Sequence, residues 1–135
     1  MNLTHLAAAR DDAGRPIKVG LIGAGKFGSM FLAQVPTSKG IEVTAIADLD
    51  PDRAHRSCRE VGWTGERVES VDFTDDSSAL FTRDDVEVIV EATGNPAAGV
   101  EHALLAIEHG KHIVMVNVEA DVLAGAYLGD KARQA

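Results

Sequence analysis

Three glycines stand at a spacing that suits the binding of a diphosphate. They form the pattern Gly-x-Gly-x-x-Gly in the segment Gly23-Ala24-Gly25-Lys26-Phe27-Gly28. Between a buried strand and a helix, the first glycine permits a tight turn, the second lets the backbone approach a pyrophosphate, and the third lets the helix pack against the strand. The helix N-terminus then offers free N–H groups to the diphosphate. We therefore predict that this segment binds a dinucleotide; a tight turn without a ligand is the alternative.

An aspartate follows this turn at the distance that a nucleotide ribose requires. Asp48 ends a second apolar run, 20 residues after Gly28, which matches the expected spacing of about 20. Its carboxylate is predicted to accept hydrogen bonds from the adenosine ribose of NAD and to repel the 2′-phosphate of NADP. The alternative role is capping of the next helix, which Asp50 could share. Arg53 leaves NADP open as the cofactor.

Polar residues also follow two later strands of the chain. Thr93 and Gly94 come directly after one apolar run, at a strand end where ligands of parallel sheets bind. They are predicted to approach the ribose or the nicotinamide, although a loop with a helix cap would explain them equally well. Asn117, Glu119 and Asp121 follow the next run. A catalytic role and a solvated helix start, favoured by the helix dipole, are both open for these three.

Strand patterns and helix patterns alternate along the chain around these residues. Short apolar or β-branched runs predict strands at Ile17–Ile22, Ile41–Ala47, Val68–Phe73 (a weak edge strand), Val86–Val90 and His112–Val116. Helices are predicted from Asn2 to about Arg10, Phe27 to Val35, Asp50 to about Gly62, Asp76 to Phe81 (capped by Thr74 or Asp75), Asn95 to Gly110, and Glu119 to about Arg133. In the helix after Asn95, the helical period predicts a buried stripe of Val100, Ala103, Leu104 and Ile107.

This alternation predicts an α/β fold with a Rossmann-type doubly wound parallel sheet in three αβα layers. Residues 1–135 are expected to form a single dinucleotide-binding domain, with residues 1–16 as an N-terminal helix and lead-in. A doubly wound sheet usually continues with another strand after the last helix. We therefore expect a domain truncated before its last strand or strands, and a substrate domain that is absent from this chain.

Composition narrows the classes of partner. The chain has 13 Lys+Arg against 21 Asp+Glu, a formal net charge of −8, so it lacks the basic excess that nucleic acid requires. Its apolar runs are too short to cross a bilayer and its start lacks the features of a signal peptide, which predicts a cytoplasmic protein. Cys58 is the one cysteine, expected in the core. His55, His102 and His109 are expected on solvated helix surfaces, and no metal site is predicted.

The sequence resembles the NAD(P)-binding domain of homoserine-dehydrogenase-like oxidoreductases. The resemblance rests on the glycine segment with its preceding strand, and on Ala45-Ile46-Ala47-Asp48-Leu49-Asp50, Glu91-Ala92-Thr93-Gly94-Asn95-Pro96 and the residues from Gly110 to Asp121. The last stretch is similar to a branch that includes deoxyxylulose-phosphate reductoisomerase-like enzymes with a SAF domain. The resemblance implies that Gly23, Gly25, Gly28, Asp48, Thr93 and Gly94 bind the cofactor, and that Asn117 lies near the nicotinamide.

One departure from that family concerns the substrate. Val118 follows Asn117, where homoserine dehydrogenases usually have a lysine, and the Glu-Lys-Pro of sugar-dehydrogenase-like relatives is absent too. This argues against homoserine itself as the substrate.

The predicted function is that of a cofactor module. It would belong to an NAD(P)-dependent oxidoreductase that transfers hydride between a nicotinamide cofactor and a small polar substrate. Because the substrate would bind through another domain, the chain alone is expected to be catalytically incomplete, with its catalytic residues unknown. Assembly into a homo-oligomer is left open, and a nucleotide-binding sensor or regulatory module without catalysis is the alternative function.

Overall fold

A parallel sheet of five strands organises residues 2–135, the part of the chain that the structure, a computed structural model, describes. The strand order is β3-β2-β1-β4-β5, and every pairing between neighbours is parallel. From β1 the chain adds β2 and then β3 on one side, and it then crosses to the other side of β1 to add β4 and β5. The strands are β1 Ile17–Ile22, β2 Ile41–Ala47, β3 Asp72–Thr74, β4 Val88–Glu91 and β5 His112–Met115.

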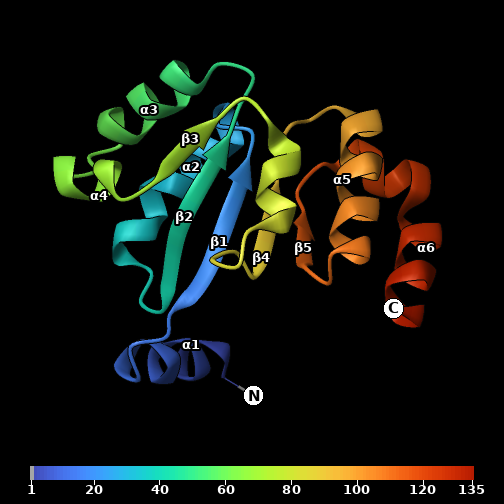
Figure 1. The fold of residues 1–135 in the computed structure, drawn as a ribbon, viewed down its shortest axis with the longest axis horizontal. Helices are drawn as coiled ribbons and strands as arrows, with labels where there is room; N and C mark the ends of the chain where they lie inside the picture. The colour runs from blue at the N-terminus through green and yellow to red at the C-terminus, as the bar shows by residue number, and fades with distance from the viewer. Residues whose placement is uncertain (1) are drawn as a thin grey trace.

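Helices connect the strands and lie on both faces of the sheet (Figure 1). The α-helices are α1 Leu3–Asp12, α2 Lys26–Gln34, α3 Pro51–Glu60, α4 Gly65–Glu69, α5 Pro96–Glu108 and α6 Val118–Gln134. Two short 3-10 segments, η1 Val35–Thr37 and η2 Ser77–Thr82, complete the connections. This is the predicted doubly wound αβα architecture, and β3 is the predicted edge strand. None of the helices in residues 2–135 has the length and apolar character needed to cross a membrane.

Two apolar cores lie on opposite faces of the sheet because successive strand residues point to opposite sides. In β1, Leu21 packs in the core under α2 and α3, whereas Ile22 packs in the core under η2 and α5. The first core includes Leu32, Cys58 and Trp63. The buried position of Cys58 agrees with its predicted place in the core.

Caps that were visible in the sequence begin several helices. The Asp50 carboxylate accepts from the N–H of Arg53 at the start of α3, and the Asn95 amide oxygen accepts from the N–H of Ala98 at the start of α5. A proline follows each cap, where its missing N–H costs nothing. Gly62 follows α3 with a positive φ of 92°, the left-handed conformation that commonly terminates helices.

Two predictions about local structure are wrong. Val68 does not begin a strand but lies buried in helix α4, and β3 begins only at Asp72. The short 3-10 segment η2 is capped by Asp76 rather than by Thr74 or Asp75. The β-branched content around Val68 favoured a strand, but the Thr64 hydroxyl accepts from the N–H of Arg67 and so caps a helical turn there.

The predicted buried stripe of α5 is only partly right, because Ala103 is buried, whereas Val100 and Ile107 are half-buried. The helix buries Gly99, His102, Ala103 and Ala106, whereas Leu104 remains 37% exposed. The small residues allow a close approach to α6: a Cβ at Gly99 would lie 2.7 Å from the Cβ of Ala120. Close helix packing therefore decides which face of α5 is buried. His102 lies in the interior beside Glu91 of β4 and Phe81 of η2, and not on a solvated surface as predicted.

Helix α2 is held against its neighbours by a tryptophan. Trp63, the one tryptophan of the chain, is 6% exposed and follows α3. Its indole N–H donates to the carbonyl oxygen of Leu32 in α2 at 2.8 Å. A buried indole N–H needs such an acceptor, so this bond joins the position of α2 to that of the chain after α3.

The start of α2 lies so close to β1 that only glycine fits. A Cβ at Gly28 would collide with the carbonyl oxygen of Gly23. We expect Gly28→Ala to lower the free energy of unfolding by about 1–3 kcal/mol, as overpacking does. Urea unfolding monitored by circular dichroism measures the change. Gly129→Ala in α6 is the control, because its Cβ would meet only Arg133 at 3.6 Å, and it should raise stability by about 0.5–1 kcal/mol. Equal effects of the two variants would contradict the packing argument.

Candidate functional site

A cleft of about 400 Å³ opens at the carboxyl ends of the strands. It lies beside the boundary between β1 and β4, where the strand order reverses and where ligands of such sheets bind. Its size falls in the usual range for small-molecule sites. The residues that line it include Gly23, Gly25, Asp48, Leu49, Arg53, Asp75, Ser77, Thr93, Asn95, Ala98, Glu101 and His102.

The glycine turn leads from β1 into the N-terminus of α2. Gly23 has a positive φ of 93°, and a Cβ there would lie 2.8 Å from the carbonyl oxygen of Ala92. Gly25 precedes α2 as its cap and contributes no side-chain bond to the helix, and a Cβ at this position would meet no protein atom within 4 Å. The first N–H groups of α2 therefore have room in front of them for an anionic group. This geometry fits a diphosphate.

Asp48 joins the glycine turn to the start of α3. Its Oδ2 accepts from the N–H of Ala24 at 2.8 Å, and its Oδ1 accepts from the N–H of Asp50 at 2.9 Å. Oδ1 also accepts from the guanidinium of Arg53 at 2.6 Å. Asp48 is 7% exposed, yet it lines the cleft. The helix-capping role that was the alternative for Asp48 belongs to Asp50.

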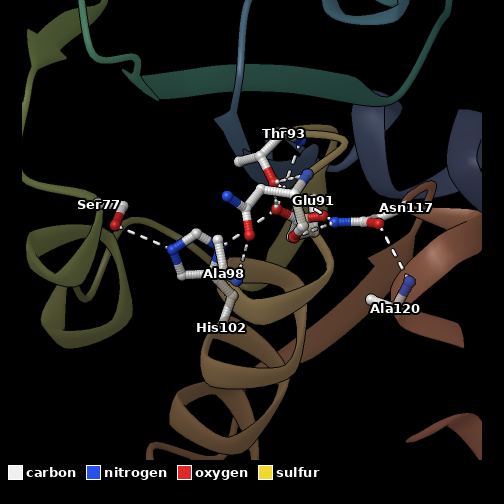
Figure 2. Close-up of polar contacts among 8 residues, drawn as sticks. Ser77, Glu91, Thr93, Ala98, His102, Asn117 and Ala120 are labelled. Atoms are coloured by element: carbon white, nitrogen blue, oxygen red, sulfur yellow. Dashed lines mark hydrogen bonds and ion pairs between the residues drawn. The ribbon is translucent and has the colours of Figure 1, made fainter. Parts of the chain in front are cut away.

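A buried carboxylate, to which the sequence patterns assign no role, lies at the end of β4. Glu91 is fully buried, and its Oε1 accepts from the hydroxyl of Thr93 at 2.5 Å. The same oxygen lies 3.2 Å from Nδ1 of His102, whose Nε2 lies 3.0 Å from the hydroxyl of Ser77. Figure 2 shows these side chains in a row from β4 through α5 to η2. The row links the buried end of β4 to two residues of the cleft lining, His102 and Ser77.

The pKa of Glu91 is set by opposing effects. Burial alone would raise the pKa, but hydrogen bonds from His102, Thr93 and Asn117 outweigh it and hold the pKa below the ordinary glutamate value. Glu91 is therefore ionised at neutral pH. Its second oxygen, Oε2, has no hydrogen-bond partner among the described residues, so the charge depends on the donors around Oε1.

Asn117 joins two loops at the carboxyl end of the sheet. It is 2% exposed, caps α6 through the N–H of Ala120, and donates to the carbonyl oxygen of Asn95 at 2.7 Å and to the hydroxyl of Thr93 at 3.4 Å. It therefore joins the loop after β4 to the loop after β5. Asn117 does not line the cleft, and its predicted place near the nicotinamide stays a prediction.

The structure brings together part of the predicted site. Gly23, Gly25, Asp48 and Thr93 line the cleft. Ala24 donates its N–H to Asp48, and Gly28 packs directly against the carbonyl oxygen of Gly23 in the turn. The cleft lining does not include Lys26, Phe27 or Gly94. Among residues 2–135, no group of three or more His, Cys, Asp or Glu is placed to hold a metal ion.

Sequence reasoning missed Ser77, Glu91 and His102. Glu91 carried the one available signal, because it is a charged residue at the end of the apolar run that forms β4. A charge in that position is rarely buried without a partner, and His102 is that partner.

The fold and the cleft together define a Rossmann-type dinucleotide-binding domain. Residues 23–134 match the family described as homoserine dehydrogenase, NAD binding domain. The chain belongs to this family.

Three known proteins illustrate the relationship. Homoserine dehydrogenase of Neisseria gonorrhoeae is 31% identical over 112 residues, which cover 76% of this chain and 23% of that protein. The structure of a homoserine dehydrogenase from Thiobacillus denitrificans superposes with a TM-score of 0.74 at 22% identity, over 89% of this chain and 28% of that one. The structure of a 3-ketoreductase from Actinomadura kijaniata, in complex with NADP and TDP-benzene, superposes with a TM-score of 0.71 at 26% identity, over 89% of this chain and 35% of that one. The chain spans about a quarter of the length of the curated relatives it matches.

The buried charge of Glu91 generates a pH-dependent prediction. Glu91→Gln should lower the free energy of unfolding at pH 7 by about 1–3 kcal/mol, because the amide oxygen still accepts but the hydrogen bonds lose their charge assistance. Because the pKa of Glu91 is lower in the folded state, its ionisation stabilises the fold at pH values above the ordinary glutamate pKa of about 4.3. This stabilisation is lost as the pH falls through the pKa of the folded state. The difference between wild type and variant should therefore close on acidification. Urea unfolding at pH 7 and at stepwise lower pH measures it.

The control for this experiment is Glu42→Gln, which removes a charge from an exposed position of β2. It should change stability by less than about 0.5 kcal/mol. A difference between wild type and Glu91→Gln that grows as the pH falls would contradict an ionised Glu91 in the folded state.

Proposed function

We propose that the chain is the cofactor-binding module of an NAD(P)-dependent oxidoreductase that acts on a small polar substrate. The observation that carries the proposal is the open space at Gly25, in front of the free N–H groups of α2 and next to the carboxylate of Asp48. A turn that served packing alone would not need such a space. Membership of an NAD-binding family supports the same function.

Each part of the cleft suits one part of the cofactor. The N-terminus of α2 would bind the diphosphate through backbone N–H groups, and Asp48 would accept hydrogen bonds from the adenosine ribose. The Thr93 hydroxyl, held by Glu91, would lie beside the ribose on the nicotinamide side. Bound nicotinamide supplies the hydride chemistry, while the protein provides orientation and electrostatics.

The choice between NAD and NADP depends on two neighbouring charges. Asp48 presents a carboxylate where a 2′-phosphate would lie, and this favours NAD. Arg53, whose side chain is 52% exposed, already forms an ion pair with Asp48. It would have to leave that carboxylate unpaired in order to bind a phosphate. NAD is therefore the favoured cofactor, and a related 3-ketoreductase in complex with NADP keeps NADP as the second candidate. A cytoplasmic location and assembly with further copies stay predictions.

Gly25→Val tests the proposed diphosphate site. The φ of Gly25 is −74°, which any residue adopts, and its Cβ would meet no protein atom within 4 Å. The variant should therefore fold, while its side chain fills the space of the diphosphate. We expect NADH binding to weaken at least about a hundredfold, equal to about 2.8 kcal/mol. Calorimetric titration measures the binding and circular dichroism the fold.

Gly65→Val is the matched control for Gly25→Val. Gly65 opens α4 outside the cleft, and its Cβ would also meet nothing within 4 Å. It should bind NADH as the wild type does. Normal NADH binding by folded Gly25→Val would mean that the turn is only structural.

Asp48→Asn tests the choice of cofactor. Its amide oxygen still accepts from the N–H of Ala24, but its charge is gone. We expect the wild type to bind NAD at least about tenfold more tightly than NADP, equal to about 1.4 kcal/mol, and Asp48→Asn to narrow this ratio. Paired titrations with both cofactors measure it. Asp50→Ser is the control, because it removes the same charge two residues away and keeps a helix cap. An unchanged ratio of NAD to NADP affinity in Asp48→Asn would show that Asp48 does not determine the choice of cofactor. Tighter binding of NADP than of NAD by the wild type would make NADP the favoured cofactor.

A further inference from the structure

The row Glu91–His102–Ser77 ends in the cleft that the glycine turn also lines. Ser77 belongs to η2 and His102 to α5, and both line the cleft. The Ser77 hydroxyl lies 3.0 Å from Nε2 of His102, and Nδ1 of His102 lies 3.2 Å from Oε1 of Glu91. His102 is 6% exposed and packs on the ring of Phe81, with 5.9 Å between the ring centroids. The imidazole is therefore fixed between its two partners.

The hydrogen bonds of this row have a defined direction. Glu91 is ionised and can only accept, so Nδ1 of His102 must carry the proton. In a neutral imidazole Nε2 is then an acceptor, and it takes the hydrogen of the Ser77 hydroxyl. The Ser77 oxygen has no hydrogen left for a ligand and presents only its lone pairs to the cleft. A buried carboxylate thus determines the hydrogen-bonding character of a serine on another element.

The order of the cleft places Ser77 where a nucleobase would lie. The glycine turn suits the diphosphate and Asp48 suits the ribose. Asp75, Ser77 and Glu101 line the same cleft, and the N–H of Asp48 donates at 3.0 Å to the carbonyl oxygen of Thr74, the residue before Asp75. The carboxylates of Asp75 and Glu101 are also acceptors when ionised. A base that enters this end meets acceptors from these three side chains, so it must offer hydrogens.

We propose that the row makes Ser77 a specificity-determining residue that selects a 6-amino purine over a 6-oxo purine. The proposal rests on the dinucleotide-binding function proposed above. The 6-amino group of adenine donates to the Ser77 oxygen, whereas a 6-oxo group brings lone pairs against lone pairs. To donate to a 6-oxo group, the Ser77 hydroxyl would have to leave Nε2 of His102 and so strand a buried acceptor.

Titration with NAD and with nicotinamide hypoxanthine dinucleotide tests the proposal. The two purines differ at C6, which carries an amino group in the first and an oxo group in the second, and at N1, which carries a hydrogen only in the second. The measurements are made at about pH 8.5, because alkaline solution disfavours an imidazolium, which would donate from Nε2 instead of accepting there. We expect the wild type to bind NAD at least about fivefold more tightly, the size of effect that one hydrogen bond produces. Ser77→Ala should bring the ratio of the two dissociation constants close to one.

His102→Asn separates selection from folding. Its amide can still donate to Glu91 in place of Nδ1, but it lacks the acceptor that holds the Ser77 hydrogen. Ser77 is then free to donate, so the variant should gain affinity for the hypoxanthine dinucleotide and the ratio should fall toward one. Ser78→Ala is the matched control, since the Ser78 hydroxyl donates to Asp76 and Ser78 is not part of the cleft lining. It should leave the ratio unchanged.

The outcomes distinguish this inference from the function on which it rests. Binding of NAD with a ratio that Ser77→Ala and His102→Asn leave unchanged would overturn the role of Ser77 and keep the dinucleotide site. A wild type that binds both dinucleotides equally would overturn it as well. Failure of the wild type to bind either dinucleotide would overturn the proposed function, and the selection of the base with it.

Discussion

The carboxylate of Glu91 lies at the end of a central strand without exposure to solvent, and an ionised group in that position requires donors from several elements at once. Removal of a charge from water is expensive unless hydrogen bonds replace the lost hydration. Thr93 supplies one donor from the loop after β4, and His102 supplies another from α5. Asn117 holds Thr93 from the start of α6. The loop after β4, α5 and the start of α6 are therefore held together around this one charge.

Asp48 plays a similar part on the other side of β1. Its side chain joins the carboxyl end of β2 to the N–H of Ala24 in the glycine turn, and Arg53 balances its charge. The two carboxylates differ in what they leave free. Asp48 lines the cleft and can exchange its partners for a ligand, whereas Glu91 is enclosed and acts through the residues that it orients. One side of the site is therefore adaptable, and the other is preorganised.

The sequence was sufficient for four of the five strands and for the glycine turn because these follow from local patterns. The run Ile17–Ile22 and the glycines after it specify a buried strand, a tight turn and a close helix without reference to the rest of the chain. His102 was beyond such reasoning. Helix α5 is apolar on more than one face, and two stripes of helical period compete there. Gly99 is buried because α6 packs closely on it, and His102 is buried beside Glu91 and Phe81. Periodicity does not encode these long-range contacts.

The same distinction explains the errors near β3. Val68 has the residue type of a strand but follows Thr64, whose hydroxyl caps a helical turn. The cap and the β-branched content pointed to different structures, and the packing of Val68 into the core beneath α4 is compatible with the helix. Ser77 was missed because its meaning depends on His102 and Glu91, which are 25 and 14 residues away in sequence. A site built from three elements is visible only once the sheet has brought them together.

The bond between Trp63 and Leu32 has an optical consequence. An indole that is buried and hydrogen-bonded to a helix carbonyl emits at shorter wavelength than one in water, and the chain has no second tryptophan to mask its signal. Its emission therefore reports on a single contact, the hydrogen bond between Trp63 and Leu32 of α2. Because reduced nicotinamide absorbs in the range where tryptophan emits, this indole is also a natural donor for energy transfer. The protein therefore carries a built-in fluorescence probe, hydrogen-bonded to the helix α2 whose N-terminus faces the cleft.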